Sequence, residues 1–338
     1  MRFLKLLIYG FFVLLFLIFL IPVFLPSSVE LSRSISMKAE ARQVFRLVNN
    51  FENWKLWSPF QLDLPEIEAR ISNPAIGEGS SLVYRSNTSG ESSITIIESH
   101  PYRSIKMMLG MQKGGIAVDE WQFEQTGDTV VVTWTLRLSE LKYPFHRYFG
   151  FFSRSLMSPF QEKGLEKLKE VATQLPPAPP SDTIMFEGFA AIVTEAGSTG
   201  NLTNDALNES AAALQQYLKR LRTDASGDLF GLYDGRQALP PVNAAVGYPV
   251  AEETRESGMF RYIEVAGGKA VTTTLVGPPA QRHRAYDELE LYLREFRLER
   301  DSTRPLIEFY SPSAGSPDSQ NDMVTRIIMF LKEKNKPE

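Results

Sequence analysis

LPPAPPSD, residues 175–182, divides the 338-residue chain into two parts. Four of its eight residues are proline, which lacks a backbone N–H and favours the extended polyproline II conformation. A proline-rich stretch of this kind acts as a semi-rigid spacer. The sequence therefore predicts a globular domain over residues 27–175, a linker over 176–182 and a second domain over 183–335.

The chain begins with an apolar stretch in which residues 6–25 (LLIYGFFVLLFLIFLIPVFL) contain no charge. As a helix, such a stretch is about 30 Å long, the thickness of a bilayer's hydrocarbon core. Arg2 and Lys5 precede it, and positive charge favours the cytoplasmic side. We expect residues 1–26 to be a single-pass anchor with the globular part on the extracytoplasmic, periplasmic side. A cleaved signal peptide is the alternative, although residues 22–26 offer no small-residue cleavage site.

Composition excludes several function classes. The chain has no cysteine, which removes disulfides, thiol nucleophiles and thiolate metal sites. A formal net charge of −4 argues against nucleic acid as a partner, because affinity there depends on a basic surface. The three histidines are scattered, and no metalloprotease, nucleophile-elbow or P-loop motif occurs. We therefore predict no metal site, no cofactor and no catalytic set.

The part before the linker has the pattern of a mixed α+β domain. Residues 29–37 alternate as a half-buried strand does, and residues 41–48 have apolar side chains at helical spacing. Residues 67–138 contain about six further strands separated by turn residues, and residues 144–174 form a final helix. We expect a curved antiparallel sheet wrapped around that helix, with a cavity between them.

This part resembles the SRPBCC superfamily, which is START-like and polyketide-cyclase-like. The resemblance lies in A-x-x-V-F-x-L-V over residues 41–48, Asn53-Trp54, Trp57-Ser58-Pro59-Phe60, and GLEKLK over residues 164–169. It implies a helix-grip fold with a hydrophobic ligand pocket and rarely a fixed catalytic set. Trp57 and Trp121 are the residues we expect to line the pocket, and the alternative is that they are simply core. The phenylalanine-rich residues 145–157 either cover the cavity mouth or lie against the membrane.

The part after the linker contains an internal repeat of strand, helix, strand, strand. The predicted elements of the two copies cover residues 185–194, 204–222, 229–233 and 244–250, then 260–274, 280–297, 305–310 and 324–331. The helices match at a constant separation of 75 residues, as in Leu214 with Leu289 and Tyr217 with Tyr292. One such unit cannot bury its sheet alone, so we expect the two copies to pair and to form a groove between them.

This second part resembles the GyrI-like family, the effector-binding domain of bacterial transcription activators, a duplicated βαββ fold of the SHS2 type. The resemblance lies in Gly267-Gly268-Lys269-Ala270-Val271, Gly277-Pro278-Pro279, Ala285-Tyr286, Tyr292-Leu293 and Leu306-Ile307-Glu308-Phe309-Tyr310. It implies that Glu308 faces the groove and engages a cationic or polar ligand, with Tyr310 and Tyr233 as wall residues.

The pattern around Glu308 supports the same expectation. Strand alternation puts Leu306, Glu308 and Tyr310 on one face. A carboxylate among aromatic rings suits an organic cation, through charge pairing and cation–π attraction. The alternative is a solvated face on which Glu308 balances a nearby arginine. His283 lies among Arg282 and Arg284 in what we interpret as a helix surface.

The predicted function is that of a membrane-anchored, extracytoplasmic protein that binds small hydrophobic, amphipathic or cationic molecules. The first alternative is a hydrolase or cyclase with Glu308 as base and Tyr310 as orienting hydroxyl. The second is an envelope interaction scaffold whose grooves are filled by side chains.

Overall fold

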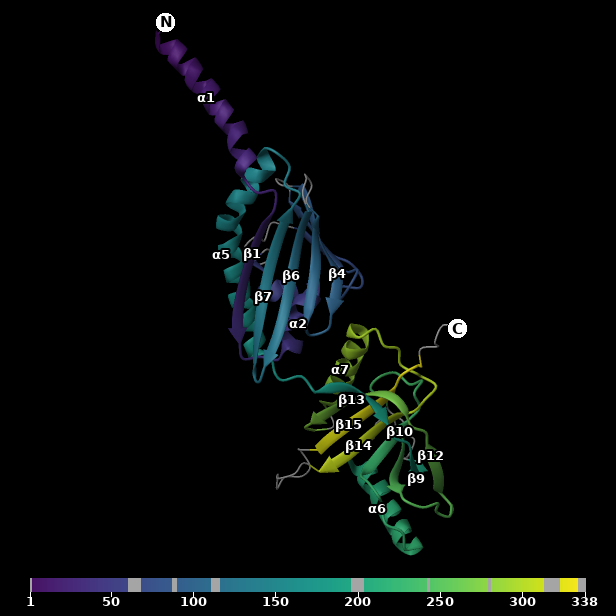
Figure 1. Cartoon of the computed structure of the whole chain (residues 1–338). Helices are drawn as coiled ribbons and strands as arrows, with labels where there is room; N and C mark the ends of the chain where they lie inside the picture. The colour runs from purple at the N-terminus through teal and green to yellow at the C-terminus, as the bar shows by residue number, and fades with distance from the viewer. Residues whose placement is uncertain are drawn as a thin grey trace. The chain divides into compact units, whose positions relative to one another are not determined.

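The computed structural model describes residues 2–59, 68–86, 90–110, 116–195, 204–241, 244–278, 281–312 and 323–333. They form two compact units, Met1–Pro177 and Ala178–Glu338 (Figure 1). Phe60, Pro279 and Ala280, which the sequence analysis assigned to motifs or to a helix start, lie outside the described residues.

The first unit begins with the apolar helix α1, Arg2–Phe24. Its segment Phe3–Phe24 has a mean hydropathy of 2.9 and is long and apolar enough to cross a membrane. The side chains of α1 are almost all exposed, so this helix is not the core of a soluble domain. Membrane spans and signal sequences both have this length and apolar character.

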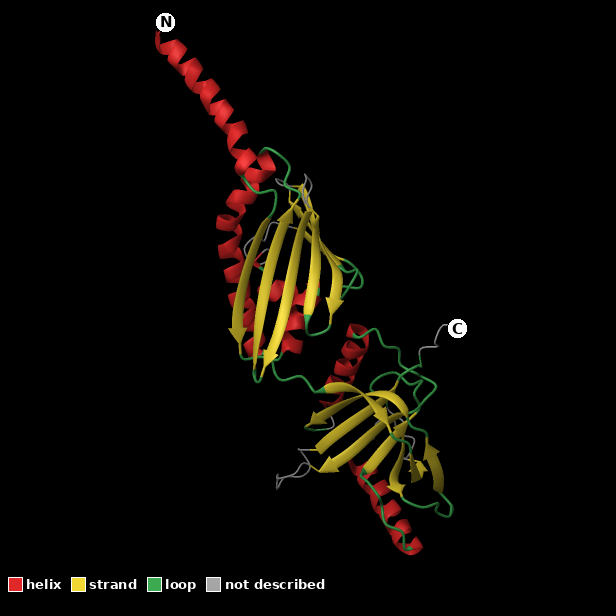
Figure 2. Ribbon diagram, in the orientation of Figure 1, coloured by secondary structure: helices red, strands yellow, loops and turns green. Residues whose placement is uncertain are grey.

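The rest of the first unit is one antiparallel sheet and the helices on it (Figure 2). The strands are β1 (Val29–Met37), β2 (Glu68–Ile71), β3 (Ser81–Ser86), β4 (Gly90–His100), β5 (Ser104–Gly110), β6 (Ile116–Thr126) and β7 (Thr129–Ser139), in the order β1-β7-β6-β5-β4-β3-β2. The helices are α2 (Ala41–Asn49), the 3₁₀ turn η1 (Phe51–Asn53), α3 (Trp54–Trp57) and the long α5 (Phe145–Gln174). The predicted combination of an antiparallel sheet with a long final helix is confirmed.

Strand alternation decides which side chains enter the core of this unit. Along β6 the buried positions are Ala117, Asp119, Trp121 and Phe123, with more exposed residues between them. β7 pairs with β6 so that Trp121 lies opposite Trp134. The apolar face of α2 and residues of α5 such as Leu165 complete the same core cluster. Sheet and helices therefore enclose an apolar interior, and among the described residues of this unit Asp119 is the one buried carboxyl group.

The second unit has an eight-stranded antiparallel sheet with one helix from each half of its sequence. Its elements are β8 (Ser181–Phe186), β9 (Phe189–Glu195), α6 (Asn204–Leu221), β10 (Leu229–Tyr233), β11 (Ala244–Val250), β12 (Phe260–Val265), β13 (Gly268–Val276), α7 (Arg282–Glu295), β14 (Leu306–Pro312) and β15 (Met323–Phe330). The order β12-β9-β11-β10-β14-β15-β13-β8 is symmetric about the central pair β10 and β14. Leu306 packs in the cluster under α7 and Tyr310 in the cluster under α6, so both helices cover the same face.

Two predicted strands are each divided by a bend. The prediction of one strand over residues 185–194 is wrong, because β8 ends at Phe186 and β9 begins at Phe189. The predicted strand over 260–274 is likewise β12 and β13, with Ala266 and Gly267 between them. The cause is a close crossing of the two bends. A Cβ on Gly188 would lie 2.6 Å from Val265 O and 2.7 Å from Gly267 N.

This crossing predicts the effect of adding one methyl group. Gly188→Ala should destabilise the second unit by about 1–3 kcal/mol, because the new Cβ meets backbone atoms that cannot rotate away. The control is Glu187→Ala, a change at the exposed neighbour in the same bend. All four tryptophans lie in the first unit, so urea unfolding followed by circular dichroism should shift while the tryptophan fluorescence transition stays in place. Equal midpoints for the two variants would contradict the account.

Candidate functional site

Glu308 lies at the centre of the second sheet. It is on β14 opposite Gly231 of β10, at the middle of the symmetric strand order. Its side chain is 1% exposed, on the face that α6 and α7 cover. The alternative of a solvated face does not hold, since helix packing removes this carboxylate from water.

Three tyrosine hydroxyls surround the carboxylate. Tyr286 Oη donates to Glu308 Oε1 at 2.5 Å, and Tyr310 Oη donates to Oε2 at 2.8 Å. Tyr233 Oη lies 3.3 Å from Oε2 and 2.8 Å from Tyr310 Oη. Hydrogen bonds to an ionised carboxylate are among the stronger hydrogen bonds in proteins. The structure thus brings together Glu308, Tyr310 and Tyr233, the three residues singled out in the second part of the sequence.

Arg282 supplies the positive charge beside this cluster. Its Nη1 lies 3.6 Å from Glu308 Oε2 and donates to Tyr233 Oη at 3.3 Å. Its Nη2 donates to Pro241 O at 2.7 Å. The interpretation of Arg282 as a helix-surface residue is wrong, because its side chain is 14% exposed and points to Glu308. Sequence spacing did not reveal this, since α7 and β14 are separate elements and the ion pair forms only when they pack.

Burial and charge act together on the ionisable groups here. Burial, and next the negative charge of Glu308, raise the pKa of Tyr286 and of Tyr310 well above the ordinary value. The same two causes raise the pKa of Tyr233. Burial is the largest single influence on Arg282 and lowers its pKa, but Glu308 and the three tyrosines together outweigh burial, so the net change in pKa is upward. The phenols therefore remain hydrogen-bond donors and the guanidinium remains a cation.

Gly231 makes room for the phenols. A Cβ at this position would lie 2.8 Å from Tyr310 Oη and 3.0 Å from Tyr233 Cε2. The strand partner of Glu308 is thus a residue without a side chain, and the space beside the carboxylate is taken by the rings of Tyr233 and Tyr310.

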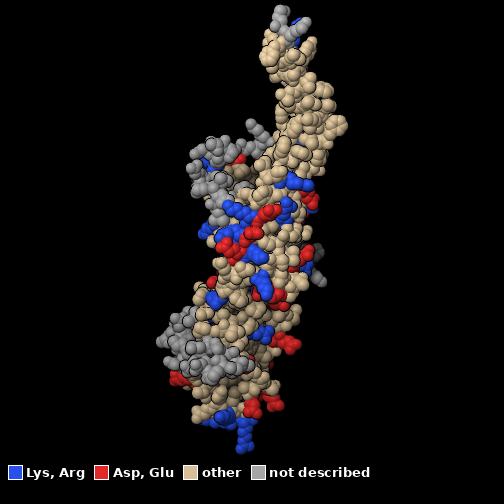
Figure 3. Space-filling model, turned by 90° about the vertical axis from the view of Figure 1, so that its left-hand side faces the viewer, with Lys and Arg blue, Asp and Glu red and all other residues tan. Residues whose placement is uncertain are grey.

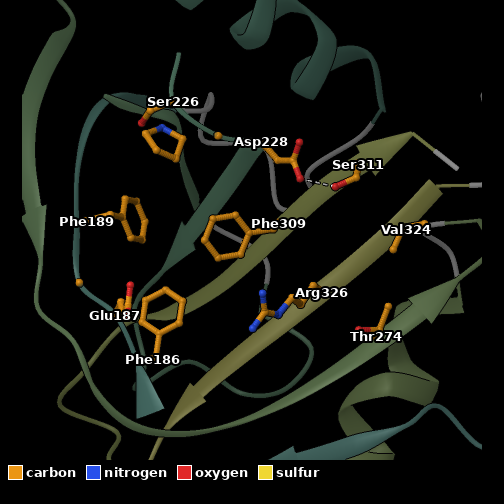
Figure 4. A pocket seen from close by; sticks show the side chains of 13 residues that line it. Phe186, Glu187, Phe189, Ser226, Asp228, Thr274, Phe309, Ser311, Val324 and Arg326 are labelled. Atoms are coloured by element: carbon orange, nitrogen blue, oxygen red, sulfur yellow. Dashed lines mark hydrogen bonds between the residues drawn. The ribbon is translucent and has the colours of Figure 1, made fainter. Parts of the chain in front are cut away.

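A cavity of about 500 Å³ lies on the opposite face of this sheet (Figure 4). The rings of Phe186, Phe189 and Phe309 line it together with Arg326 and Asp228. Its volume is within the ~300–1,000 Å³ usual for small-molecule sites. Phe309 is the neighbour of Glu308 in β14, so alternation puts the two side chains on opposite faces. This cavity was not predicted from the sequence. The feature that could have indicated it is the pair of phenylalanines that flank the bend at Gly188.

Trp57 and Trp121, the predicted lining residues of the first unit, are almost completely buried. Trp57 Nε1 donates to Leu47 O at 2.9 Å, and the Trp57 ring contacts that of Trp121 at a centroid distance of 5.6 Å. Trp121 stacks on Trp134 at 4.5 Å. Trp57 also borders a cavity of about 630 Å³ whose other walls include Lys163, Glu166 and further side chains of α5. Both tryptophans are thus members of the core around which any ligand must fit.

The same interior holds buried polar atoms that make no hydrogen bond to the described residues. They are Asp119 Oδ1, Trp121 Nε1, Trp134 Nε1 and Gln161 Oε1. Burial raises the pKa of the Asp119 carboxyl to about 7, while the Trp134 indole N–H, which approaches this carboxyl without reaching hydrogen-bond geometry, lowers the pKa by less. An unpaired buried polar group is costly, so such a group marks a place where a ligand or water would bind. The sequence analysis missed Asp119, although its position in the alternation with Ala117 and Trp121 was a usable signal.

Comparison with known proteins assigns a family model to the first unit. Residues 28–173 match the family described as "Polyketide cyclase / dehydrase and lipid transport". This agrees with the predicted SRPBCC resemblance and with the helix-grip arrangement of sheet and long helix. No curated protein matches the chain.

Solved structures with a similar fold cover parts of the chain. Norcoclaurine synthase from Thalictrum flavum is 13% identical, with a TM-score of 0.34, and the match covers 44% of this chain and 96% of that one. Protein SA2116 from Staphylococcus aureus is 16% identical, with a TM-score of 0.36 and coverage of 45% and 99%. An EcmrR–DNA complex is 13% identical, with a TM-score of 0.42 and coverage of 56% and 70%. With TM-scores below 0.5, none of the three bears on function.

The raised pKa of Asp119 predicts a pH-dependent stability. The pKa in the fold is about 7 and the ordinary value is 3.8, so the fold favours the neutral carboxyl. The stabilisation that Asp119 gives the fold is fully present at pH values below 3.8. It is lost as the pH rises from there through about 7. The loss should be about 4 kcal/mol between pH 4 and pH 8. Asp119→Asn should remove that slope and unfold later than the parent at pH 8, as measured by tryptophan fluorescence in urea.

Asp128→Asn is the matched control, because Asp128 is exposed and lies in the turn between β6 and β7. It should keep the slope of the parent protein. If the unfolding free energy of Asp119→Asn changes with pH as that of the parent protein does, another group causes the change.

Removal of Arg282 should destabilise the second unit strongly. Arg282→Ala leaves the buried Glu308 without its cation, a change that costs about 3–5 kcal/mol in comparable buried pairs. Arg294→Ala on the same helix is the control, since Arg294 pairs with Glu290 in an exposed i, i+4 arrangement and should cost at most about 0.5 kcal/mol. Urea unfolding followed by circular dichroism measures both. A similar cost for the two variants would mean that the Arg282–Glu308 pair contributes little.

Proposed function

We propose that the chain is a membrane-anchored protein that binds small apolar or amphipathic molecules. The observation that carries the proposal is the set of unpaired buried polar atoms around the Trp121–Trp134 stack, with Asp119 as the acidic member. A family model that includes lipid transport covers this unit. The fold that this model describes is associated with the binding of small molecules or lipids.

The chemistry of the first site defines its ligand. Stacked indole rings and the surrounding apolar core suit a flat or chain-like hydrocarbon body. Asp119 suits a hydroxyl or amine on that body, because the carboxyl can accept a hydrogen bond that the described residues do not supply to Oδ1. The ligand we propose therefore combines an apolar body with one hydrogen-bond donor.

The second unit is proposed to be a duplicated βαββ domain of the GyrI-like type that binds an organic cation. The symmetric strand order about β10 and β14 supports the duplication. Glu308, Tyr310 and Tyr233 are the proposed ligand-binding residues. The guanidinium of Arg282 already occupies the position beside the carboxylate, so the incoming cation would replace it. Exchange of one cation for another keeps the buried carboxylate paired throughout.

The hydrogen bonds on Glu308 favour binding over catalysis. A general base has to present a free lone pair to the proton that it removes. Here three hydroxyl groups approach the two carboxylate oxygens, and Arg282 lies beside them. We therefore keep the hydrolase or cyclase function as the alternative. Turnover of a small electrophile that disappears in Glu308→Gln would support it.

The proposed anchor is α1, with the two units on the extracytoplasmic side. Support for the anchor comes from the length and apolar character of α1. Support for the orientation comes only from Arg2 and Lys5, which precede the apolar segment. Tethering raises the effective concentration of both units at the bilayer, where apolar ligands partition.

Two probes test the two sites separately in the full chain in lipid nanodiscs. A long-chain alcohol should bind the parent protein, and Asp119→Ala should weaken it about tenfold, because one hydrogen bond to a carboxyl group is lost. Asp128→Ala should bind as the parent does. Tetraphenylphosphonium should bind the second unit, and Glu308→Gln should weaken it by about tenfold or more. Isothermal calorimetry measures each affinity.

The outcomes separate the two parts of the proposal. Alcohol binding that is unchanged in Asp119→Ala would remove Asp119 from the first site. Phosphonium binding that is equal in Glu308→Gln and the parent would remove the second site. Absence of binding for both probes and for fatty acids and amines would favour an envelope scaffold.

A further inference from the structure

We infer that the first three turns of α5, residues 145–156, lie in the membrane–water interface and bind a lipid surface rich in anionic headgroups. The inference rests on the proposed anchor α1 and adds a second membrane contact to it. It concerns the part of α5 that precedes the ligand-facing Gln161.

Two phenols join the start of α5 to the end of α1. Pro22 has no N–H, so Ile18 O lacks its partner four residues on. Tyr148 Oη donates to that carbonyl at 3.1 Å. Tyr143 Oη donates to Phe19 O at 2.5 Å. A gap made by proline inside an apolar helix is therefore filled from a segment 130 residues further along the chain.

Arg147 extends the same junction to the last turn of α1. Its Nη1 donates to Pro22 O at 2.9 Å and approaches Val23 O at 3.5 Å. Carbonyls in the last turn of a helix have no partner within the helix. Three side chains of one segment thus bind carbonyls of residues 18–23, and this fixes the first turns of α5 at the depth where α1 leaves the membrane.

Large apolar side chains of α5 face outward at this depth. Phe145, Phe149, Phe152 and Leu156 follow at helical spacing of four, three and four residues, which puts them on one stripe. Their exposed fractions are 65, 44, 55 and 64%. Gly150 and Ser153, between them, are buried against the protein. An exposed stripe of this size next to a membrane span is typical of an interfacial helix.

The charge of the segment selects a lipid surface over other apolar partners. Residues 141–161 contain Lys142, Arg147 and Arg154 and no acidic residue. Cationic side chains beside an apolar stripe attract anionic headgroups. In Figure 3 the surface of α1 is tan except at its N-terminal tip, and most blue and red side chains lie below it. The hydrogen bonds from Tyr148 and Arg147 to α1 put the stripe at the C-terminal end of this apolar surface, with Lys142 and Arg154 as cations nearby in the sequence.

Single cysteines test the inference in the full chain, because the protein has no cysteine of its own. Phe152→Cys and Leu156→Cys carry a nitrobenzoxadiazole label on the stripe, and Phe12→Cys carries it on α1. Lys169→Cys is the control on an exposed position of the same helix. Each protein is reconstituted in vesicles of phosphatidylcholine and phosphatidylglycerol. Nitroxide on the lipid chains then quenches labels in the bilayer, and iodide quenches labels in water.

We expect lipid nitroxide to reduce the fluorescence of labels at 152 and 156 at least about twofold, and iodide to reach only the label at 169. Iodide quenching at 152 and 156, with lipid quenching at 12, would overturn the inference and leave the anchor intact. Labels at 152 and 156 shielded from both quenchers would also overturn it, in favour of a second copy of the chain on the stripe. Absence of lipid quenching at 12 would overturn the anchor as well. Near-ultraviolet circular dichroism checks that each variant is folded.

Discussion

The need to pair polar groups that are removed from water is the constraint on which this structure depends. It acts at the end of α1, where phenols and a guanidinium bind backbone carbonyls. It acts at Glu308, whose carboxylate is surrounded by hydroxyls and Arg282. Asp119 is the exception, because its Oδ1 makes no hydrogen bond to the described residues. An unpaired buried group costs about 1–3 kcal/mol.

Glu308 and Asp119 show the two ways in which a fold can hold a buried acid. Glu308 has its own cation, so its site is closed and a ligand must compete with Arg282. No cation of the described residues pairs with Asp119, and burial moves its pKa to about 7. The first arrangement favours stability in the absence of a ligand, and the second leaves a polar position for a ligand to fill. Shifted acids of the second kind are more often functional than acids in closed networks.

Patterns within one element were predictable from the sequence, and contacts between elements were not. Alternation along one strand correctly put Leu306, Glu308 and Tyr310 on one face. Arg282 and Tyr286 were not assigned to Glu308, because they reach it from a helix that is distant in sequence. The bend at Gly188 was missed for the same reason, since this glycine is needed only where the other bend crosses it. The alternation along β6 placed Asp119 on the same face as Ala117 and Trp121. Its burial, which distinguishes it from an ordinary surface acid, was visible only in the structure.

Helix α5 relates the membrane contact to the first site. The helix is continuous over 30 residues, from Phe145 to Gln174. Gln161, whose Nε2 donates to Trp134 O, is sixteen residues from the start, or about 24 Å along the axis. Its first turns are fixed to α1, so with the proposed anchor in a bilayer the unpaired atoms of the first site would lie beyond the headgroup region. In that arrangement the proposed ligand would leave the lipid before it binds. For such a ligand the tether shortens the path between lipid and protein, and the polar atoms near Trp134 replace hydrogen bonds that it loses on leaving the headgroups.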